Sequence, residues 1–312
     1  MHNLLILSPD AEQYESLLLR RGLSGLDIHA APDVAIGRRY IADAEIILGM
    51  PGWVKALLPQ SKNLAWVQST FAGIDALCTA GLPKNYTLTG VKGIFGPLIS
   101  EYVFAHILAN ERHLFGQREN QTNRRWREIP YRGLKGVAMG ICGYGSIGQH
   151  IAHIARCFGM RVTAYKRSDQ PVEGVEQLYS PPELNVFLRE LEYLVITLPA
   201  TAETRGLIDA AALACMKPSA VLINVGRGQV VVESALIHAL EHKHIKGAVL
   251  DVFEQEPLPP DSPLWSMSNV IVTPHNSGVS FPSDIVDIFC DNYARYMTGQ
   301  RLEHVIDLEK GY

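Results

Sequence analysis

Short runs of apolar residues alternate with amphipathic stretches along the chain. In the N-terminal part, the apolar runs predict buried strands at 4–7, 46–48, 64–67 and 87–91. Two stretches with helical periodicity, 10–21 and 33–42, lie between the earlier runs. This alternation of strands and helices is typical of an α/β protein.

A second series of apolar runs begins at Val137 and predicts further strands at 161–165, 193–198, 221–225, 248–252 and 270–273. Helical periodicity also marks residues 98–118 and 282–297, and the first of these is followed by a polar stretch up to Arg132 that suits an arm or linker. The two helices would connect two domains, so that the chain leaves the first domain, forms the second and returns.

We therefore expect an α/β fold of two Rossmann-like, doubly wound domains. A discontinuous, flavodoxin-like substrate domain would comprise residues 1–98 and 283–312, and a nucleotide-binding domain at 99–282 would be inserted into it. The length of 312 residues suits two domains of ordinary size, and 47% hydrophobic residues suffice for full cores.

Charge and cysteine content narrow the function classes. The net charge of −4 argues against a nucleic-acid surface, and the one basic cluster, at 124–127, is short. The five cysteines show neither Cys-x-x-Cys pairs nor zinc spacing, so we expect no metal and a reducing compartment. No run resembles a signal peptide or a membrane span. A cytoplasmic protein without nucleic-acid or membrane partners is the simplest expectation.

The most informative segment is 137–152, where a buried strand passes through Gly-x-Gly-x-x-Gly into an amphipathic helix. Gly143 permits the tight turn, Gly145 leaves room for phosphate oxygens, and Gly148 lets helix and strand pack closely. The motif alone also occurs in ordinary turns, but the strand before it and the helix after it supply the required context. The predicted dinucleotide loop consists of Gly143, Tyr144, Gly145, Ser146, Ile147 and Gly148.

Three more segments lie at or beyond the carboxyl ends of predicted strands, where open α/β sheets bind their ligands. They are Asn-Val-Gly-Arg-Gly at 224–228, Leu-Asp-Val-Phe-Glu-Gln-Glu-Pro at 250–257 and Thr-Pro-His-Asn at 273–276. Together with the glycine loop, in this order and spacing, they resemble the D-isomer-specific 2-hydroxyacid dehydrogenase family. The resemblance covers nearly the whole chain, and it is closest to the glyoxylate and hydroxypyruvate reductase branch.

The resemblance implies a catalytic set of Arg227, Glu256 and His275. Reduction of a 2-keto acid needs a group that binds the substrate carboxylate, and the planar Arg227 can do so with two hydrogen bonds. It also needs a proton donor, and His275 titrates close to neutral pH. A carboxylate at Glu256 would favour the imidazolium. Taken singly, an arginine in a Gly-Arg-Gly turn is more often a solvated surface group, and a glutamate before proline is usually an ordinary loop acid.

Other positions match the family's ligand-binding residues. Those expected along the dinucleotide are Pro199, Thr204, Val225, Gly226 and Asp251, although Asp251 could instead cap a turn after its strand. Those expected at the substrate are Met50, Ala72, Gly73 and Arg227, with the loop at 71–75 offering backbone N–H groups to the carboxylate. Packing is an equal alternative for Met50.

The stretch after the 98–118 helix predicts assembly as well. It has few partners in its own chain, and two-fold dimers are the commonest oligomers, so we expect a homodimer that buries it. In the glyoxylate and hydroxypyruvate reductases, a tryptophan on the dimerisation arm reaches the partner's active site. Trp126 lies at a similar place, but the local match is loose and that role stays open.

The residues after the 161–165 strand predict which dinucleotide binds. NAD sites of this kind place an acid about 20 residues beyond the glycine loop, on the ribose hydroxyls. Here Lys166, Arg167 and Ser168 precede the first acid, Asp169. The cations and the hydroxyl can bind the additional phosphate of NADP. We expect NADP, with NADPH preferred, over NAD; the alternative is a solvated basic turn.

These features predict an NAD(P)-dependent reductase that converts a small 2-keto acid of the glyoxylate or hydroxypyruvate type to the D-2-hydroxy acid. Two alternatives stay open. One is another dehydrogenase of the family, of the short phosphoglycerate or the D-lactate type. The other is a dinucleotide-sensing protein like the family's transcriptional corepressors, because a fold does not guarantee activity.

Overall fold

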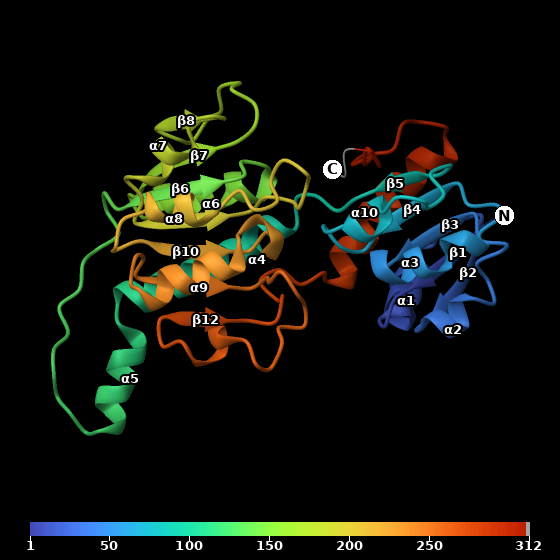
Figure 1. Ribbon diagram of the computed structural model, residues 1–312. Coiled ribbons are helices and arrows are strands. Elements are labelled where there is room, and N and C mark those ends of the chain that lie inside the picture. Colours follow the sequence, from blue (N-terminus) through green and yellow to red (C-terminus); the bar gives the residue numbers. More distant parts are fainter. Residues whose placement is uncertain (310–312) are drawn as a thin grey trace. The chain divides into compact units, whose positions relative to one another are not determined.

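The computed structural model describes residues 1–309 and divides into two compact units. Unit 1 comprises residues 1–94 with 280–312, of which 310–312 lie outside the described residues, and unit 2 comprises residues 95–279 (Figure 1). The chain therefore crosses between the units twice. The sequence-based boundaries at 98/99 and 282/283 stand a few residues further along than these crossings.

Unit 1 is built on a parallel sheet with the order β2-β1-β3-β4-β5 among the described residues. The strands are β1 (His2–Leu7), β2 (Leu26–Ala31), β3 (Ile46–Gly49), β4 (Trp66–Ser69) and β5 (Thr87–Thr89). The helices are α1 (Ala11–Arg21), α2 (Val34–Gly37), α3 (Pro51–Leu57) and α10 (Pro282–Met297). This strand order is the flavodoxin-like one. Trp66 of β4 stacks on Phe289 of α10 with ring centroids 5.0 Å apart, so α10 completes the core.

Unit 2 contains a second parallel sheet, in the order β12-β11-β10-β9-β6-β7-β8 within the described chain. The strands are β6 (Ala138–Cys142), β7 (Arg161–Tyr165), β8 (Gln177–Tyr179), β9 (Tyr193–Ile196), β10 (Val221–Asn224), β11 (Gly247–Leu250) and β12 (Val270–Val272). The strand order reverses between β6 and β9. In a doubly wound sheet this switch point, at the carboxyl ends of the strands, is where ligands bind.

The helices of unit 2 are α4 (Phe95–Glu111), α5 (Leu114–Thr122), α6 (Ser146–Cys157), α7 (Leu184–Leu188), α8 (Ala210–Ala214) and α9 (Glu233–Glu241). The fold predicted from the sequence, two parallel α/β sheets, is confirmed. None of the helices in the described residues is long and apolar enough to cross a membrane.

Two strands and one helix break were not predicted. The strands β2 and β8 are edge strands in which most residues are only half-buried, so neither shows a continuous apolar run. The helix expected at 98–118 is divided by His113, whose φ of 52° is left-handed. The imidazole of His113 lies 2.9 Å from the carbonyl oxygen of Pro130, a contact with a distant position that local periodicity cannot reveal.

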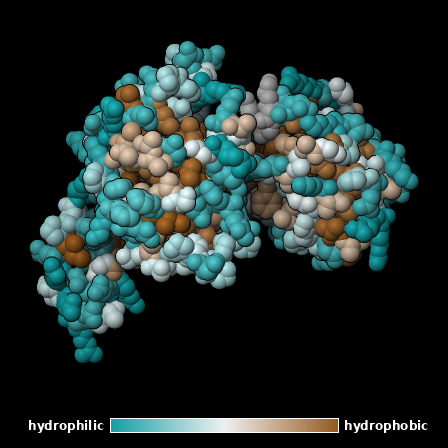
Figure 2. Space-filling view, viewed as in Figure 1, coloured by the Kyte–Doolittle hydropathy of each residue, from teal (hydrophilic) through white to brown (hydrophobic). Residues whose placement is uncertain are grey.

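The segment between the end of α4 and Leu134 forms an arm, defined here as residues 112–132, which projects from the rest of unit 2 (Figure 1). No residue of α5 is buried. The exposed large apolar side chains of the arm are Leu114, Phe115, Trp126 and Tyr131. Figure 2 shows the arm as a mainly hydrophilic surface interrupted by apolar side chains.

The base of the arm is held by a buried carboxylate. Glu111 is 6% exposed and accepts hydrogen bonds from Arg132 Nε at 2.9 Å and Nη2 at 3.1 Å. The hydroxyl of Tyr193 donates to Glu111 at 2.7 Å. Burial alone would raise the pKa of Glu111, but these hydrogen bonds and the charge of Arg132 lower it. The arm therefore begins and ends at one charged pair beside the sheet.

Candidate active site

The glycine loop connects β6 to α6 as the sequence predicted. A Cβ added to Gly148 would lie 2.2 Å from the carbonyl oxygen of Gly143, so only glycine allows the helix to pack this closely on the strand. In contrast, a Cβ on Gly145 would meet nothing within 4 Å. Gly145 and Ser146 are exposed at the start of α6, where backbone N–H groups lack helical partners. This open cradle has the form that a pyrophosphate requires.

The basic residues proposed for cofactor selection directly follow β7, the strand next to β6. Lys166 is half-buried, whereas Arg167 and Ser168 are exposed. The guanidinium of Arg167 lies 3.0 Å from a carboxylate oxygen of Glu203. Glu203 belongs to the loop after β9, so the ion pair joins the loops that follow β7 and β9, the two neighbours of β6 in the sheet. The sequence analysis did not single out Glu203.

The loop after β9 contains Pro199 and Thr204. The hydroxyl of Thr204 accepts the N–H of Thr201 at 2.8 Å and donates to the carbonyl oxygen of Pro199 at 2.6 Å. Pro199 is exposed. Thr204 therefore shapes the turn and leaves Pro199, predicted to lie along the dinucleotide, on its exposed side.

Arg227 is placed by the turn that follows β10. Asn224, at the end of the strand, donates its side-chain amide to the carbonyl oxygen of Arg227 at 3.1 Å and accepts the N–H of Gly226 at 3.1 Å. A Cβ on Gly228 would lie 1.9 Å from the carbonyl carbon of Phe253. The glycine thus brings the Arg227 turn into contact with the loop after β11. Val225 and Gly226 are buried, and Arg227 is half-buried.

Glu256 and His275 form a hydrogen-bonded pair. The Nδ1 atom of His275 lies 2.8 Å from a carboxylate oxygen of Glu256, and the other oxygen accepts the N–H of Phe253 at 3.0 Å. The side chain of His275 is 51% exposed. One imidazole nitrogen is therefore fixed in the loop, while much of the ring stays accessible.

The electrostatics of this pair favour an imidazolium next to a carboxylate. The hydrogen bond to Glu256 raises the pKa of His275, although burial and the charge of Arg227 oppose the shift. Burial on its own would raise the pKa of Glu256, but the hydrogen bonds from His275 and Phe253, with the charges of His275 and Arg227, lower it. The proton thus stays on His275 to a higher pH than on an isolated imidazole.

Asp251 has the surroundings of a turn cap. It is fully buried, and one carboxylate oxygen accepts from the Thr273 hydroxyl at 2.6 Å and the Asn276 N–H at 2.9 Å. The other accepts the Ser277 N–H at 2.9 Å. These contacts fix the turn that contains His275, whose φ of 52° is left-handed. The hydrogen bonds correspond to the capping alternative for Asp251, in which it positions the histidine.

A residue that contacts this turn from α4 was missed by the sequence analysis. The hydroxyl of Tyr102 on α4 lies 2.6 Å from the Thr273 hydroxyl, which itself donates to Asp251. Tyr102 therefore donates to Thr273. Burial raises the pKa of Tyr102 to about 12, so the hydroxyl stays a donor. The two side chains are 171 positions apart in sequence, and no local pattern could have indicated their contact.

The residues predicted to bind substrate in unit 1 lie at the carboxyl ends of two paired strands. Met50 follows β3 and is half-buried at the start of α3, and the loop at 71–73 follows β4. Gly49 and Ser69, the last residues of the two strands, are partners in the sheet. The Ser69 hydroxyl donates to the carbonyl oxygen of Phe71 at 2.7 Å and accepts its N–H at 3.1 Å. Ala72 is exposed and Gly73 half-buried.

The site in unit 2 thus combines a phosphate cradle, an arginine turn and a carboxylate–histidine pair at the carboxyl edge of one sheet. The model of the D-isomer specific 2-hydroxyacid dehydrogenase, NAD binding domain, matches residues 104–277, more than half of the chain. The chain belongs to the D-isomer specific 2-hydroxyacid dehydrogenase family. This dehydrogenase is accordingly an NAD(P)-dependent oxidoreductase.

Several solved structures are similar to the dehydrogenase over its whole length. A family member from Aeromonas salmonicida subsp. salmonicida A449 is 47% identical, with 98% of this chain and 99% of that chain covered and a TM-score of 0.94. The NADPH-dependent glyoxylate/hydroxypyruvate reductase from Sinorhizobium meliloti, in complex with NADP and sulfate, is 30% identical, with both chains covered to 100% and a TM-score of 0.88.

A third structure, a D-isomer specific 2-hydroxyacid dehydrogenase from Xanthobacter autotrophicus Py2, was solved in complex with NADPH and MES. It is 31% identical to this dehydrogenase, covering 100% of this chain and 99% of its own, with a TM-score of 0.86. The family resemblance inferred from the four sequence motifs is therefore confirmed.

Proposed function

We propose that this dehydrogenase reduces a small 2-keto acid, of the glyoxylate or hydroxypyruvate type, to the D-2-hydroxy acid with NADPH. The observation that carries the proposal is the 2.8 Å contact between Glu256 and His275, with the charge of Arg227 acting on both groups. A carbonyl reduction needs an acid that is protonated near neutral pH and a cation for the substrate carboxylate. These three residues provide both.

The roles follow from the contacts. Because Glu256 engages Nδ1, His275 has Nε2 available to protonate the keto oxygen. Arg227 has a planar guanidinium suited to binding the substrate carboxylate with two hydrogen bonds. NADPH, when bound, supplies the hydride. In unit 1, the backbone of Ala72 and Gly73 and the side chain of Met50 are the proposed substrate-binding groups.

The choice of NADPH rests on the turn after β7. Lys166 and Arg167 offer positive charge, and Ser168 a hydroxyl, where an NAD-selective site would present an acid to the ribose. The exposed cradle at Gly145 suits the pyrophosphate. The Sinorhizobium meliloti relative, described as NADPH-dependent, was crystallised with NADP. Charge-assisted hydrogen bonds, each worth about 1.5–3 kcal/mol, would favour NADPH by roughly 10–1000-fold.

We also propose that the dehydrogenase is a homodimer in which the arm contacts a second copy. The support is the exposure of Phe115, at 66%, and of Trp126, at 103%, on a segment whose helix α5 has no buried residue. A concentration of exposed apolar side chains marks contact surfaces, and the arm carries four of them, Leu114, Phe115, Trp126 and Tyr131. A structure of the dimer would show whether Trp126 also reaches the partner's substrate.

Steady-state kinetics with glyoxylate and hydroxypyruvate, each with NADPH and NADH, test the proposed reaction. Cofactor oxidation should be fastest with NADPH, and His275→Ala should reduce kcat by roughly 10²–10⁴-fold while cofactor binding is retained. Arg167→Ala should weaken the binding of NADPH far more than the binding of NADH.

Three outcomes would contradict the proposal. Higher kcat/KM with pyruvate or 3-phosphohydroxypyruvate would favour a D-lactate or phosphoglycerate dehydrogenase. Cofactor binding without turnover on any 2-keto acid would favour a sensor. Equal or better kcat/KM with NADH in the unmodified enzyme would refute the cofactor preference.

A further inference from the structure

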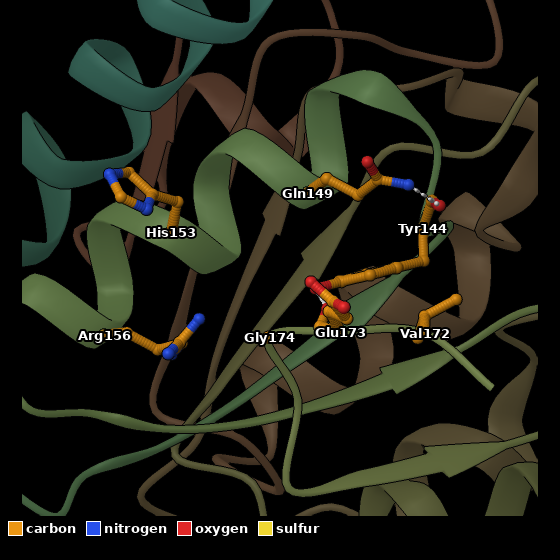
Figure 3. Close-up of a pocket in the computed structure, with 7 residues that line it drawn as sticks. All are labelled: Tyr144, Gln149, His153, Arg156, Val172, Glu173 and Gly174. Atoms are coloured by element: carbon orange, nitrogen blue, oxygen red, sulfur yellow. Dashed lines mark hydrogen bonds between the residues drawn. The ribbon is translucent and has the colours of Figure 1, made fainter.

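Tyr144, the second residue of the glycine loop, has its side chain directed away from the open cradle. The side chain is 7% exposed, and its hydroxyl donates to the carbonyl oxygen of Glu173 at 2.8 Å. Figure 3 shows the ring extending from the loop at the start of α6 to the turn that carries Glu173 and Gly174. Tyr144 therefore joins the glycine loop to a segment about thirty positions later in the sequence.

That segment connects β7 to β8 and begins with the proposed phosphate-binding residues. Its two ends are fixed to the sheet edge: the Lys166 N–H donates to Tyr179 O at 3.1 Å, and the Glu176 N–H donates to Val162 O at 2.7 Å. Between these points, the Tyr144 hydroxyl fixes the backbone at Glu173. We call residues 167–175 the selectivity loop, because the proposed NADPH contacts Arg167 and Ser168 lie in it.

The approach of Tyr144 to this loop depends on a glycine. Gly174 has a φ of +86°, and a Cβ at this position would lie 3.1 Å from the Tyr144 hydroxyl and 3.3 Å from Arg156 Nη1. A larger residue would be strained in this backbone conformation and would also press on both groups. The glycine backbone at position 174 therefore permits the close approach of the Tyr144 hydroxyl to the loop.

A cavity lies next to the hydrogen bond between Tyr144 and Glu173. It has a volume of 360 Å³ and lies between the polar face of α6, which carries Gln149 and His153, and the turn at 172–174 (Figure 3). The turn and the helix face each other across this space, and Arg156 of α6 approaches the turn at Gly174. The Tyr144 hydroxyl spans the distance at one end of the cavity. Burial raises the pKa of Tyr144, although the charge of Arg156 opposes the shift, so the hydroxyl stays protonated.

We propose that Tyr144 is a positioning residue for cofactor selection: by holding Glu173, its hydroxyl keeps the selectivity loop in the conformation in which Arg167 and Ser168 meet the additional phosphate of NADPH. This inference rests on the NADPH preference proposed above. It assigns to Tyr144 a role that differs from direct contact with the dinucleotide. A loop held in its binding conformation loses less entropy when the ligand binds, and affinity is correspondingly higher.

The test is Tyr144→Phe, which keeps the buried ring and removes the hydrogen bond. The exposed position of Glu173 lets water replace the lost donor, so the variant should fold. A neutral hydrogen bond contributes about 0.5–1.5 kcal/mol, and we expect the Kd for NADPH to rise by roughly 2–10-fold while the Kd for NADH rises less. Tyr179→Phe on β8 is the matched control and should leave both constants unchanged.

Hydrogen–deuterium exchange without cofactor provides the second measurement. Amides of the selectivity loop should exchange faster in Tyr144→Phe than in the unmodified dehydrogenase and in Tyr179→Phe. Unchanged exchange, or an equal loss of NADPH and NADH affinity, would overturn the inference. Equal affinity of the unmodified dehydrogenase for both cofactors would instead refute the NADPH preference, and the exchange data would then decide separately whether Tyr144 holds the loop.

Discussion

His275 is fixed by two different carboxylates. Asp251 binds the N–H groups of Asn276 and Ser277 and thereby holds the turn, whereas Glu256 binds the imidazole itself. The first carboxylate is fully buried and the second lies in an accessible loop. Backbone position and proton affinity are thus controlled by separate residues, and changes at each should have separate effects.

The first prediction concerns the pH dependence of keto-acid reduction. The imidazolium of His275 is the form present below its pKa, which Glu256 raises above the ordinary value of about 6.5. Reduction should therefore persist to a higher pH than for an isolated imidazole and fall as the pH rises through the raised pKa. In Glu256→Gln, the falling limb of kcat/KM against pH should move to lower pH.

A suitable control is Asp261→Asn, which changes an exposed acid in the same connection between β11 and β12. In Asp261→Asn, the falling limb of kcat/KM against pH should coincide with that of the unmodified dehydrogenase. If Glu256→Gln leaves the limb unmoved as well, Glu256 does not set the proton affinity of His275.

The ion pair between Arg167 and Glu203 leads to the second prediction. Bound NADPH would require Arg167 to exchange the Glu203 carboxylate for phosphate. Because both side chains are more than 60% exposed, the pair contributes at most about 1 kcal/mol. Glu203→Gln should therefore strengthen NADPH binding by up to about 5-fold, measured by fluorescence titration. Glu190→Gln, at an exposed ion pair with Lys217, is the control; weaker NADPH binding in Glu203→Gln would contradict the exchange.

At the scale of elements, the loops of unit 2 are placed by glycines of two kinds. Gly228 and Gly148 permit backbones to touch, whereas Gly145 faces open space. Glycines of the first kind serve the fold, and the role proposed for Gly145 is to bind the dinucleotide. The same residue type in neighbouring loops should therefore respond differently to the same substitution.

The third prediction compares Gly228→Ala with Gly145→Ala. In Gly228→Ala, the new Cβ would lie 1.9 Å from the backbone of Phe253, and overpacking of this kind costs about 1–3 kcal/mol or more. The thermal midpoint should fall clearly. Gly145→Ala should keep its midpoint, because the Cβ meets nothing, but should bind NADPH more weakly. A stable Gly228→Ala protein would show that the two loops do not need their close contact.

The elements that the sequence predicted best are those buried on both faces. Strands such as β6 and β10 are continuous apolar runs, and two of the four motifs, the glycine loop and the Arg227 turn, follow them directly. The edge strand β8 was missed because its half-exposed residues lack that pattern, and the break at His113 was missed because it accompanies a contact with Pro130, 17 positions away. Tyr102 and Glu203 were missed for the same reason: their partners are distant in sequence.

At the scale of the whole molecule, the arm is the most exposed part of unit 2. Its base is fixed by the Glu111–Arg132 pair, so its apolar side chains are presented on a segment with defined ends. Such a segment can bind a second copy with little loss of chain entropy at its base. In the proposed dimer, Glu111 would therefore link the assembly to the fold of unit 2.

The fourth prediction is that the unmodified dehydrogenase has the mass of a dimer at micromolar concentration, measured by light scattering. Phe115→Asp, which places a charge on the apolar side of the arm, should shift the mass toward the monomer. Gln117→Asp adds the same charge at an exposed polar position of α5 and should remain dimeric. A monomer mass for the unmodified protein would contradict the assignment.

The insertion of unit 2 into unit 1 also has a consequence for the order in which the chain folds during synthesis. Unit 2 is contiguous, so the ribosome releases all of its strands before α10 exists. Unit 1 needs α10 to cover Trp66, and the Asn292 side chain on α10 must reach Gln68, 224 positions earlier. The first ninety-four residues therefore wait, with an apolar face uncovered, until the rest has been translated. Once α10 has been translated, a folded unit 2 makes closure of unit 1 easier, because its two ends lie close together, with Gly278 beside Ile99, and the effective length of the loop to be closed is shorter.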